Sequence, residues 1–471
     1  MFKIVINGII ADLKGASKQE LVFQNPMWDY EGMLGEYGLP FSLPFCPVND
    51  RIFNNARSEF SATPAPTYIC EQYLNDDLVA EGLIALLDTN GAYNIHFTSN
   101  IRDIFTPVSG SVRYDGYLRD ILPAGPSVNP VANRNAMTTW NGIVCYPSIL
   151  NDQFYAANAP GGWNNEVNSY SASSYQNTTF VPCVSVKYIL GQIETYYGID
   201  IFGDFMTDTA FDKLIIFHNT AEDGSTTANL KIAVGDIKVA EFINFLRNTF
   251  GLTGTIDLLN KKIQLDYCSK YFNAEVSADW SGICSKLSSK TASPYTGIEL
   301  DYFIDEDDKK IKISTQFGKY STANSKTNRL IKSSLCPAEY NPSSPFQNWM
   351  EQNGRTATNG QHNKAVKPRI AFYFGTFSVG GVVKPQYDWQ VGTYSLRSTG
   401  VSITRNIKFA SEETFWQNTF EASFMINLRK INLSGFDLKS KVHINGWNYL
   451  IKRIVMDCNN PEKSLLEAYR A

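Results

Sequence analysis

The chain has 471 residues, of which 43% are hydrophobic, 13% aromatic and 19% charged, and its formal net charge is -4. A chain of this length is expected to form about two to four domains, because single hydrophobic cores stop growing at roughly 250–300 residues. The slightly acidic balance argues against a protein that grips DNA phosphates by itself, which would be expected to show a basic excess. No stretch approaches the about 18 uncharged apolar residues of a membrane helix, so no stable membrane insertion is predicted.

The N-terminal region reads as strands joined by tight turns. The Asn7-Gly8 pair predicts a hairpin turn, and no secretory cleavage site follows it. Alternating apolar residues predict a meander of three strands, over 67–73, 78–87 and 92–97. We expect an N-terminal β-barrel domain over 1–110.

Residues 111–179 are rich in aromatic residues, Asn and Ser, and neither the helical nor the strand period persists there. So many aromatic residues argue against plain disorder. We predict an irregular but ordered insertion that packs against a neighbouring subunit or domain. The alternative is a long surface insertion on one subunit.

The most regular pattern lies in 180–290, where two amphipathic helices are each predicted to lead into a hairpin. The first helix has Ser185 as its N-cap and Gly198 as its stop. The second is predicted to have Asp236 as its cap and Gly251 as its terminator. Its hairpin is expected to turn at 259–261. This region is predicted to be a helix-hairpin α/β domain.

Residues 291–471 are predicted to form a C-terminal β-barrel domain with a long loop at about 317–365. A hairpin over 297–316 is expected to turn at four acidic residues, 305–308. This turn lacks the ligand order, central glycine and terminal glutamate of a calcium loop, so it is interpreted as a solvated turn. The Asn445-Gly446 pair predicts a hairpin within 441–456. Further strands are expected at 369–377, 394–396, 420–428 and 464–469.

The residues that could carry chemistry do not form recognisable motifs. The eight cysteines form no CxxC pair, which favours reduced thiols used as small apolar residues, with a disulfide or metal role as the alternative. The four histidines, two of them in predicted strands, are interpreted as structural: His96, His218, His362 and His443. The motifs of zinc peptidases, α/β-hydrolases and phosphate-binding loops are missing.

Two neighbouring carboxylates are the remaining candidate for catalysis. Glu299 and Asp301 share one face of a predicted strand. Paired carboxylates perform glycoside hydrolysis, but a solvated strand face is the preferred interpretation of this pair. We therefore predict that the chain is not an enzyme, and we assign no catalytic, cofactor-binding or metal-binding residue.

Several segments, in the same order along the chain, resemble the hub or tail-tip proteins of tailed bacteriophages. The matching segments are 38–53 (GLPFSLPFCPVNDRIF), 180–182 (FVP), 188–190 (YIL), 197–199 (YGI), 203–205 (GDF), 213–217 (KLIIF), 239–250 and 256–265. The closing hairpin at 441–456 also resembles the last barrel of these proteins.

The resemblance implies an α+β, β-dominated fold with tube-like antiparallel β-barrel domains and an inserted helix-hairpin region. It implies a structural virion protein, a baseplate hub at the distal end of the tail, assembled in the host cytoplasm. Such proteins form a ring, here expected to be a homotrimer, that gates DNA ejection. The implied partners are a tail tube or distal tail protein above, spike, fibre or tail-tip proteins below, the tape-measure protein, and DNA as passing cargo.

Two other classes of function are alternatives to this interpretation. A carbohydrate-binding or cell-wall-degrading tail protein could stack sugar rings on tryptophans such as Trp140, Trp163 and Trp349. A bacterial adhesin or surface-lipoprotein assembly module would require an export signal, and none is recognised in the sequence.

Overall fold

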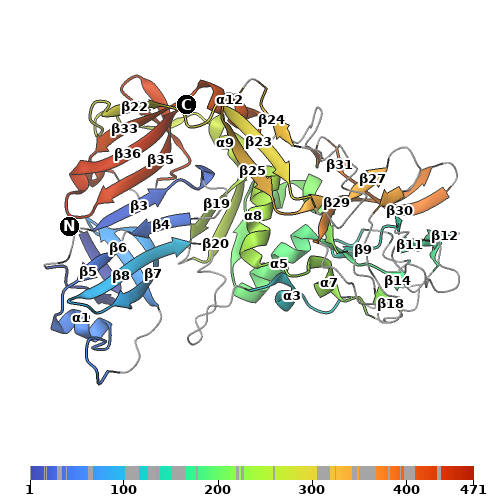
Figure 1. Cartoon of the computed structure of the whole chain (residues 1–471), viewed down its shortest axis with the longest axis horizontal. Coiled ribbons are helices and arrows are strands. Elements are labelled where there is room, and N and C mark those ends of the chain that lie inside the picture. Colours follow the sequence, from blue (N-terminus) through green and yellow to red (C-terminus); the bar gives the residue numbers. More distant parts are fainter. Residues whose placement is uncertain are drawn as a thin grey trace.

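The computed structural model describes the chain except residues 1, 15, 17–18, 29–33, 39, 62–66, 101–115, 126–134, 136–137, 139, 151–164, 177–178, 219–221, 224–226, 258–259, 305–318, 324, 342–346, 350–366, 380–381, 393, 397–408 and 432–435. The molecule is elongated, with the first and last strands at one end and the helices α5 and α8 near its middle (Figure 1). It is an α+β fold in which strands dominate, as the sequence predicted.

Within the described residues, fourteen strands form one curled sheet, which is antiparallel except where β21 meets β34. The N-terminal strands are β1 (Phe2–Ile6), β2 (Ile9–Ile10), β3 (Glu20–Gln24), β4 (Leu34–Gly38), β5 (Phe41–Leu43), β6 (Tyr68–Leu74), β7 (Asp77–Asp88) and β8 (Tyr93–Asn100). The later strands are β21 (Val276–Asp279), β22 (Ser289–Ala292), β33 (Phe420–Ile426), β34 (Lys441–Ile444), β35 (Trp447–Asp457) and β36 (Ser464–Arg470).

The turns of this sheet follow the local sequence signals. Asn7 and Gly8 both have positive φ between β1 and β2, and Asn445 and Gly446 do the same between β34 and β35. Two-residue hairpin turns need this left-handed geometry, which Asn and Gly adopt at low cost. The predicted hairpins and the β6–β7–β8 meander are confirmed.

The two ends of the chain meet in the middle of the sheet. β3 pairs antiparallel with β35, so that Leu21 lies opposite Met456. Buried side chains of the sheet form one hydrophobic cluster that includes Ile4, Phe97 and Leu466. The sheet and its core thus run across the predicted N-terminal and C-terminal domains, and the division into domains stays a prediction.

The central helices confirm most of the predicted pattern. α5 (Val186–Tyr197) begins after Ser185, whose Oγ accepts a hydrogen bond from the Tyr188 amide at 3.3 Å, and it ends at left-handed Gly198. α8 (Val239–Phe250) ends at left-handed Gly251.

One predicted cap is wrong. The N-cap of α8 is Lys238, without a side-chain cap. Asp236 lies in the preceding turn, where its carboxylate contacts Arg119 on the short helix α3 (Leu118–Ile121). After Asp236, Lys238 forms an antiparallel β-bridge with Tyr117. The helix can therefore begin only at Val239, later than an Asp236 cap would place it.

The hairpin predicted after α5 is also wrong. β16 (Asp200–Phe202) pairs parallel with β20 (Lys262–Tyr267), whose other neighbour is β19 (Leu252–Asp257). β17 (Leu214–Phe217) instead lies between β15 (Cys183–Ser185) and β29 (Arg369–Val379) in another sheet. The predicted β19–β20 hairpin is confirmed, although Leu259 of its turn lies outside the described residues.

In the region after residue 290, the stretch 317–365 that was expected to be a loop contains strands at 320–321, 328–333, 336–337, 339–341 and 347–349. β23 (Gly297–Tyr302) pairs parallel with β25 (Asn328–Ser333), within the stretch expected to be a loop. The buried face of β25 carries Arg329, Ile331 and Ser333, and two polar residues among three do not produce a hydrophobic alternation. The acidic turn 305–308 and the predicted return strand lie outside the described residues.

The remaining elements are short. The additional strands are β9 (Val144–Cys145), β10 (Ile149–Leu150), β11 (Glu166–Val167), β12 (Tyr170–Ser171), β13 (Ser174–Tyr175), β14 (Thr179–Phe180), β18 (Glu222–Asp223), β24 (Tyr320–Ser321), β26 (Cys336–Pro337), β27 (Glu339–Asn341), β28 (Gln347–Trp349), β30 (Val382–Asp388), β31 (Gln390–Val391) and β32 (Tyr394–Ser395). The additional helices are α1 (Pro47–Ile52), α6 (Asp204–Thr207), α7 (Leu230–Val234), α9 (Cys268–Phe272), α12 (Ala410–Asn418), η1 (Pro26–Trp28), η3 (Thr209–Lys213), η4 (Leu428–Lys430) and η5 (Pro461–Lys463).

The aromatic-rich insertion contributes to the central core. Tyr146, Tyr170 and Tyr175 are buried in the same cluster as the apolar faces of α5 and α8. The Tyr175 hydroxyl donates to the Tyr146 carbonyl at 2.7 Å. These residues therefore pack within their own chain.

Candidate interaction site at the junction of the sheet and the helices

The junction between the large sheet and the rest of the molecule is centred on Trp28 in η1. Its ring contacts four aromatic rings from three segments, α9, α12 and β36, at centroid distances between 5.1 and 5.9 Å: Phe272, Phe415, Trp416 and Tyr469. Its indole N–H donates to the Ile451 carbonyl of β35 at 2.7 Å. Edge-to-face and stacked pairs each add about 0.5–1.5 kcal/mol beyond burial, so this residue joins the sheet to α9 and α12.

A buried ion pair lies beside these rings. Arg329 contacts the Glu412 carboxylate at 3.3 Å, and the side chains are 6% and 1% exposed. Arg329 also donates to the Trp28 carbonyl at 2.5 Å, while Glu412 accepts from the Trp416 indole N–H at 3.0 Å. Buried charges need such additional hydrogen bonds to offset their desolvation.

A carboxylate network fixes the segment that leads into α9. Asp266 accepts hydrogen bonds from the Tyr271 hydroxyl at 2.8 Å and from the Asp204 amide at 3.1 Å. Burial raises the pKa of Asp266, but these hydrogen bonds, together with Lys270 and Lys439, outweigh burial and leave its pKa below the ordinary value.

Gly203 makes this network sterically possible. Its φ is +115°, and a Cβ placed there would lie 2.7 Å from the Leu265 carbonyl oxygen. A glycine is therefore required directly after β16, where the backbone passes close to Leu265 of β20. This explains the GDF segment as a structural feature.

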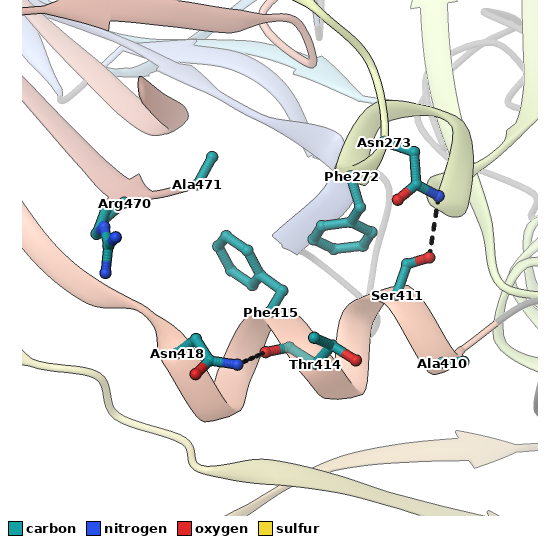
Figure 2. Close-up of a pocket in the computed structure, with 9 residues that line it drawn as sticks. All are labelled: Phe272, Asn273, Ala410, Ser411, Thr414, Phe415, Asn418, Arg470 and Ala471. Atoms are coloured by element: carbon teal, nitrogen blue, oxygen red, sulfur yellow. Dashed lines mark hydrogen bonds between the residues drawn. The ribbon is translucent and has the colours of Figure 1, made fainter. Parts of the chain in front are cut away.

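A pocket of about 420 Å³ opens next to the Trp28 junction. Figure 2 shows α12 along one side, the end of α9 opposite, and the last residues of β36 closing the third side. The lining residues are Phe272, Asn273, Ala410, Ser411, Thr414, Phe415, Asn418, Arg470 and Ala471. Volumes of this size are typical of ligand pockets.

Two hydrogen bonds hold the walls of the pocket. The Asn273 amide donates to the Ser411 hydroxyl at 3.0 Å, which joins α9 to α12 (Figure 2). The Thr419 hydroxyl, at the C-terminus of α12, donates to the Arg470 carbonyl at 2.6 Å. The three elements are thus fixed to one another before any ligand binds.

The pocket has little signal in the sequence. The apolar face of α12 is weak, because most residues of the helix are polar or charged and only Glu412 and Trp416 are buried. The adjacent Phe415-Trp416 pair was the available signal, and its meaning depends on segments that are distant along the chain.

The two candidate carboxylates, Glu299 and Asp301, both lie on β23. Among the described residues, no group of three or more His, Cys, Asp and Glu side chains could hold a metal ion. Glu299 is bound to Lys319 at 2.8 Å and accepts from Ser321 at 3.0 Å. His96 and His443 lie on strands, His218 follows β17, and His362 lies outside the described residues.

The cysteines are free thiols and six of the eight are buried. Cys145 and Cys183 lie opposite each other on β9 and β15. Burial and the neighbouring Cys183 raise the pKa of the Cys145 thiol well above its ordinary value, which disfavours the reactive thiolate.

Of the three tryptophans proposed to stack on sugars, the structure describes the side chain of Trp140. Trp140 is partly buried and packs against Tyr373 at a ring distance of 5.6 Å. Trp163 lies outside the described residues, as does the side chain of Trp349. In the part of the chain that the structure describes, no helix is both long and apolar enough to cross a bilayer.

No protein-family model and no curated protein matches the chain. Solved structures that align with it include prophage tail proteins, as the sequence resemblance suggested, and PdpA-VgrG complexes. The 43 kDa tail protein of prophage MuSo2 from Shewanella oneidensis is 10% identical, with 100% of this chain and 96% of that chain covered and a TM-score of 0.36. A tail protein from Neisseria meningitidis MC58 is 8% identical, with coverage of 100% and 95% and a TM-score of 0.34. The prophage tail protein gp18 from Listeria monocytogenes EGD-e is 8% identical, with coverage of 99% and 94% and a TM-score of 0.35. Overlaps this loose do not establish a function.

Proposed function

We propose that the chain is a structural, non-enzymatic subunit of a phage tail that assembles into a closed ring at the distal end. In this proposal the ring is a homotrimer that joins the tail tube to a spike or fibres, and its opening releases DNA. Three features support this proposal: the segments that resemble phage hub proteins, the curled sheet, and the exposed edge strand of that sheet.

The observation that carries the proposal is the open edge of the large sheet. All four residues of β22 are exposed, and among the described strands β22 pairs only with β33. An edge strand presents unpaired N–H and C=O groups, which proteins normally cover or use for pairing with another chain. A ring of subunits provides such a cover.

Exposed aromatic residues elsewhere fit an assembled subunit. Phe60 is 90% exposed, and Phe374 and Phe377 form an exposed edge-to-face pair on β29. Exposed apolar groups of this kind are typical of surfaces that contact other proteins. The net charge of -4 fits a lumen through which DNA passes without being held.

Immunogold electron microscopy of phage particles from the source culture, with antibody against the recombinant chain, tests the location. Gold at the tail tip is expected. Gold absent from particles, or found on cell surfaces, contradicts the proposal.

Hydrogen exchange tests the edge. The amides of 289–292 that point away from β33 should exchange rapidly in the free chain and slowly in the particle, because a neighbouring subunit would cover that side of β22. β33, which is paired on both sides, is the internal control. Equal exchange of 289–292 in the two states would show that β22 is not an assembly edge.

A further inference from the structure

We propose that the pocket between α9, α12 and β36 binds an acidic peptide segment of a partner protein, through a carboxylate on Arg470 and an apolar side chain on Phe272 and Phe415. This proposal does not depend on the ring or on the position of the chain in a tail.

Arg470 provides the charge. It is the one cation among the lining residues, and the lining contains no Asp or Glu side chain. In the described part of the chain its guanidinium forms no ion pair, and its Nε is buried without a hydrogen-bond partner. Arginine is the side chain best suited to hold a carboxylate, because its N–H groups can donate two parallel hydrogen bonds to the two carboxylate oxygens.

The position of Arg470 is fixed in advance. Its guanidinium lies over the Trp447 ring at 4.6 Å, and its carbonyl is held by Thr419. A cation stacked on an aromatic ring keeps its N–H groups in the plane available for hydrogen bonds. Little side-chain freedom is therefore lost when a carboxylate binds.

Two phenylalanine rings provide the apolar surface. Phe272 and Phe415 are partly exposed, lie 5.0 Å apart and occupy the middle of the pocket (Figure 2). They pack on the Trp28 junction behind them, so the surface is rigid. An apolar side chain placed there would be buried against both rings, with about 25 cal/mol gained for each Å² removed from water.

The polar lining suits an extended backbone. The side-chain amide N–H of Asn418 donates to the backbone carbonyl of Thr414 at 2.8 Å. The side-chain carbonyl oxygen of Asn418 can then accept a hydrogen bond from a ligand. The Ser411 hydroxyl accepts from Asn273 and can still donate its own proton. A peptide offers both the N–H and the C=O that these groups require, in addition to the carboxylate and the apolar side chain.

The test is selection of peptides from a random 12-residue display library on the immobilised full-length chain, followed by fluorescence anisotropy of the most enriched peptide. We expect enriched sequences with Asp or Glu beside Leu, Phe, Tyr or Trp, and an affinity that falls as salt increases. Arg470→Gln should raise Kd at least tenfold. Thr414→Trp, at an exposed helix position, should abolish binding by filling the pocket.

Arg429→Gln is the matched control, because it makes the same charge change at an exposed arginine on η4 and should leave Kd unchanged. Circular dichroism and unfolding midpoints confirm that each variant is folded. If Arg470→Gln alone is misfolded, Thr414→Trp decides the result.

Three outcomes overturn the proposal. The first is no enrichment, or enrichment of peptides that bind the Thr414→Trp variant equally well. The second is Arg470-dependent self-association of the chain in sedimentation, which would make a second copy the occupant. The third is Arg470-dependent binding of oligogalacturonate without any acidic peptide, which would make the site one for sugar acids.

Discussion

At the scale of single residues, the stability of the Trp28 junction depends on charged side chains that are buried together with their partners. Arg329 and Glu412 illustrate the point, since each satisfies the charge of the other and also binds a tryptophan. Arg329→Met should destabilise the fold by about 3–5 kcal/mol, because Glu412 would keep a buried charge without its partner. Urea unfolding monitored by tryptophan fluorescence measures this change.

The double variant Arg329→Met, Glu412→Gln is the control for this prediction. Glutamine can still accept the Trp416 indole hydrogen bond and carries no charge, so part of the lost stability should return. A double variant no more stable than Arg329→Met would show that the loss comes from packing against Trp28.

Gly203 allows a second test at this scale. Gly203→Ala should cost about 1–3 kcal/mol, because its positive φ and the nearby Leu265 carbonyl both oppose a Cβ. Gly282→Ala is the matched control, since nothing lies within 4 Å of its added Cβ. Equal unfolding midpoints for the two variants in urea would contradict the steric explanation.

Asp266 predicts a pH dependence. Its pKa is lowered in the folded state, so its contribution to stability is complete above its unfolded pKa of about 4 and is lost as the pH falls through the folded value. Unfolding midpoints measured from pH 7 to pH 3 should fall less steeply for Asp266→Asn than for the natural chain. Asp76→Asn, at a side chain that is 89% exposed, should leave the slope nearly unchanged. Parallel slopes for Asp266→Asn and the natural chain would refute the assignment.

At the scale of elements, the helix caps distinguish a correct sequence signal from a misleading one. Ser185 caps α5, so Ser185→Ala should destabilise the fold by about 1 kcal/mol. Asp236 does not cap α8, so Asp236→Ala should change stability by less than about 0.5 kcal/mol, the scale of an exposed ion pair. Thermal unfolding measures the stability change of both variants. A larger loss of stability for Asp236→Ala than for Ser185→Ala would show that Asp236 caps α8.

The elements that sequence predicted correctly are those determined by their own residues. The Asn445-Gly446 turn and the stop at Gly251 depend on φ values that few residues adopt. β16 was misassigned because its partner is β20, which follows only after the helices α6, α7 and α8 and the strands β17, β18 and β19, and a parallel pairing leaves no local turn signal. The pocket was missed for a similar reason: Phe272, Phe415 and Arg470 come together only through the tertiary fold.

At the scale of the whole molecule, the shared sheet predicts that the two ends of the chain unfold together. Val22 is paired with Val455 on one side and Tyr37 on the other, so Val22→Pro would place a proline inside a central strand, where the missing N–H and the ring disrupt the pairing. Hydrogen exchange should show lost protection over 20–24 and also over 453–457. α5 and α8 belong to a different hydrophobic cluster and should keep their protection. Loss confined to 20–24 would show that the predicted N-terminal and C-terminal domains are separate units.

The pairing of β3 with β35 also has a consequence for synthesis. The Asn25 side chain binds the Ile451 carbonyl at 2.7 Å, across 426 residues of chain. At about 5–20 residues per second on the ribosome, the first strands would wait roughly 20–90 s for this partner. During that interval the backbone N–H and C=O groups on one side of β3 are unpaired and can pair with a strand of another chain. Nascent chains should therefore depend on chaperones or low expression temperature, and fragments that lack β35 should aggregate.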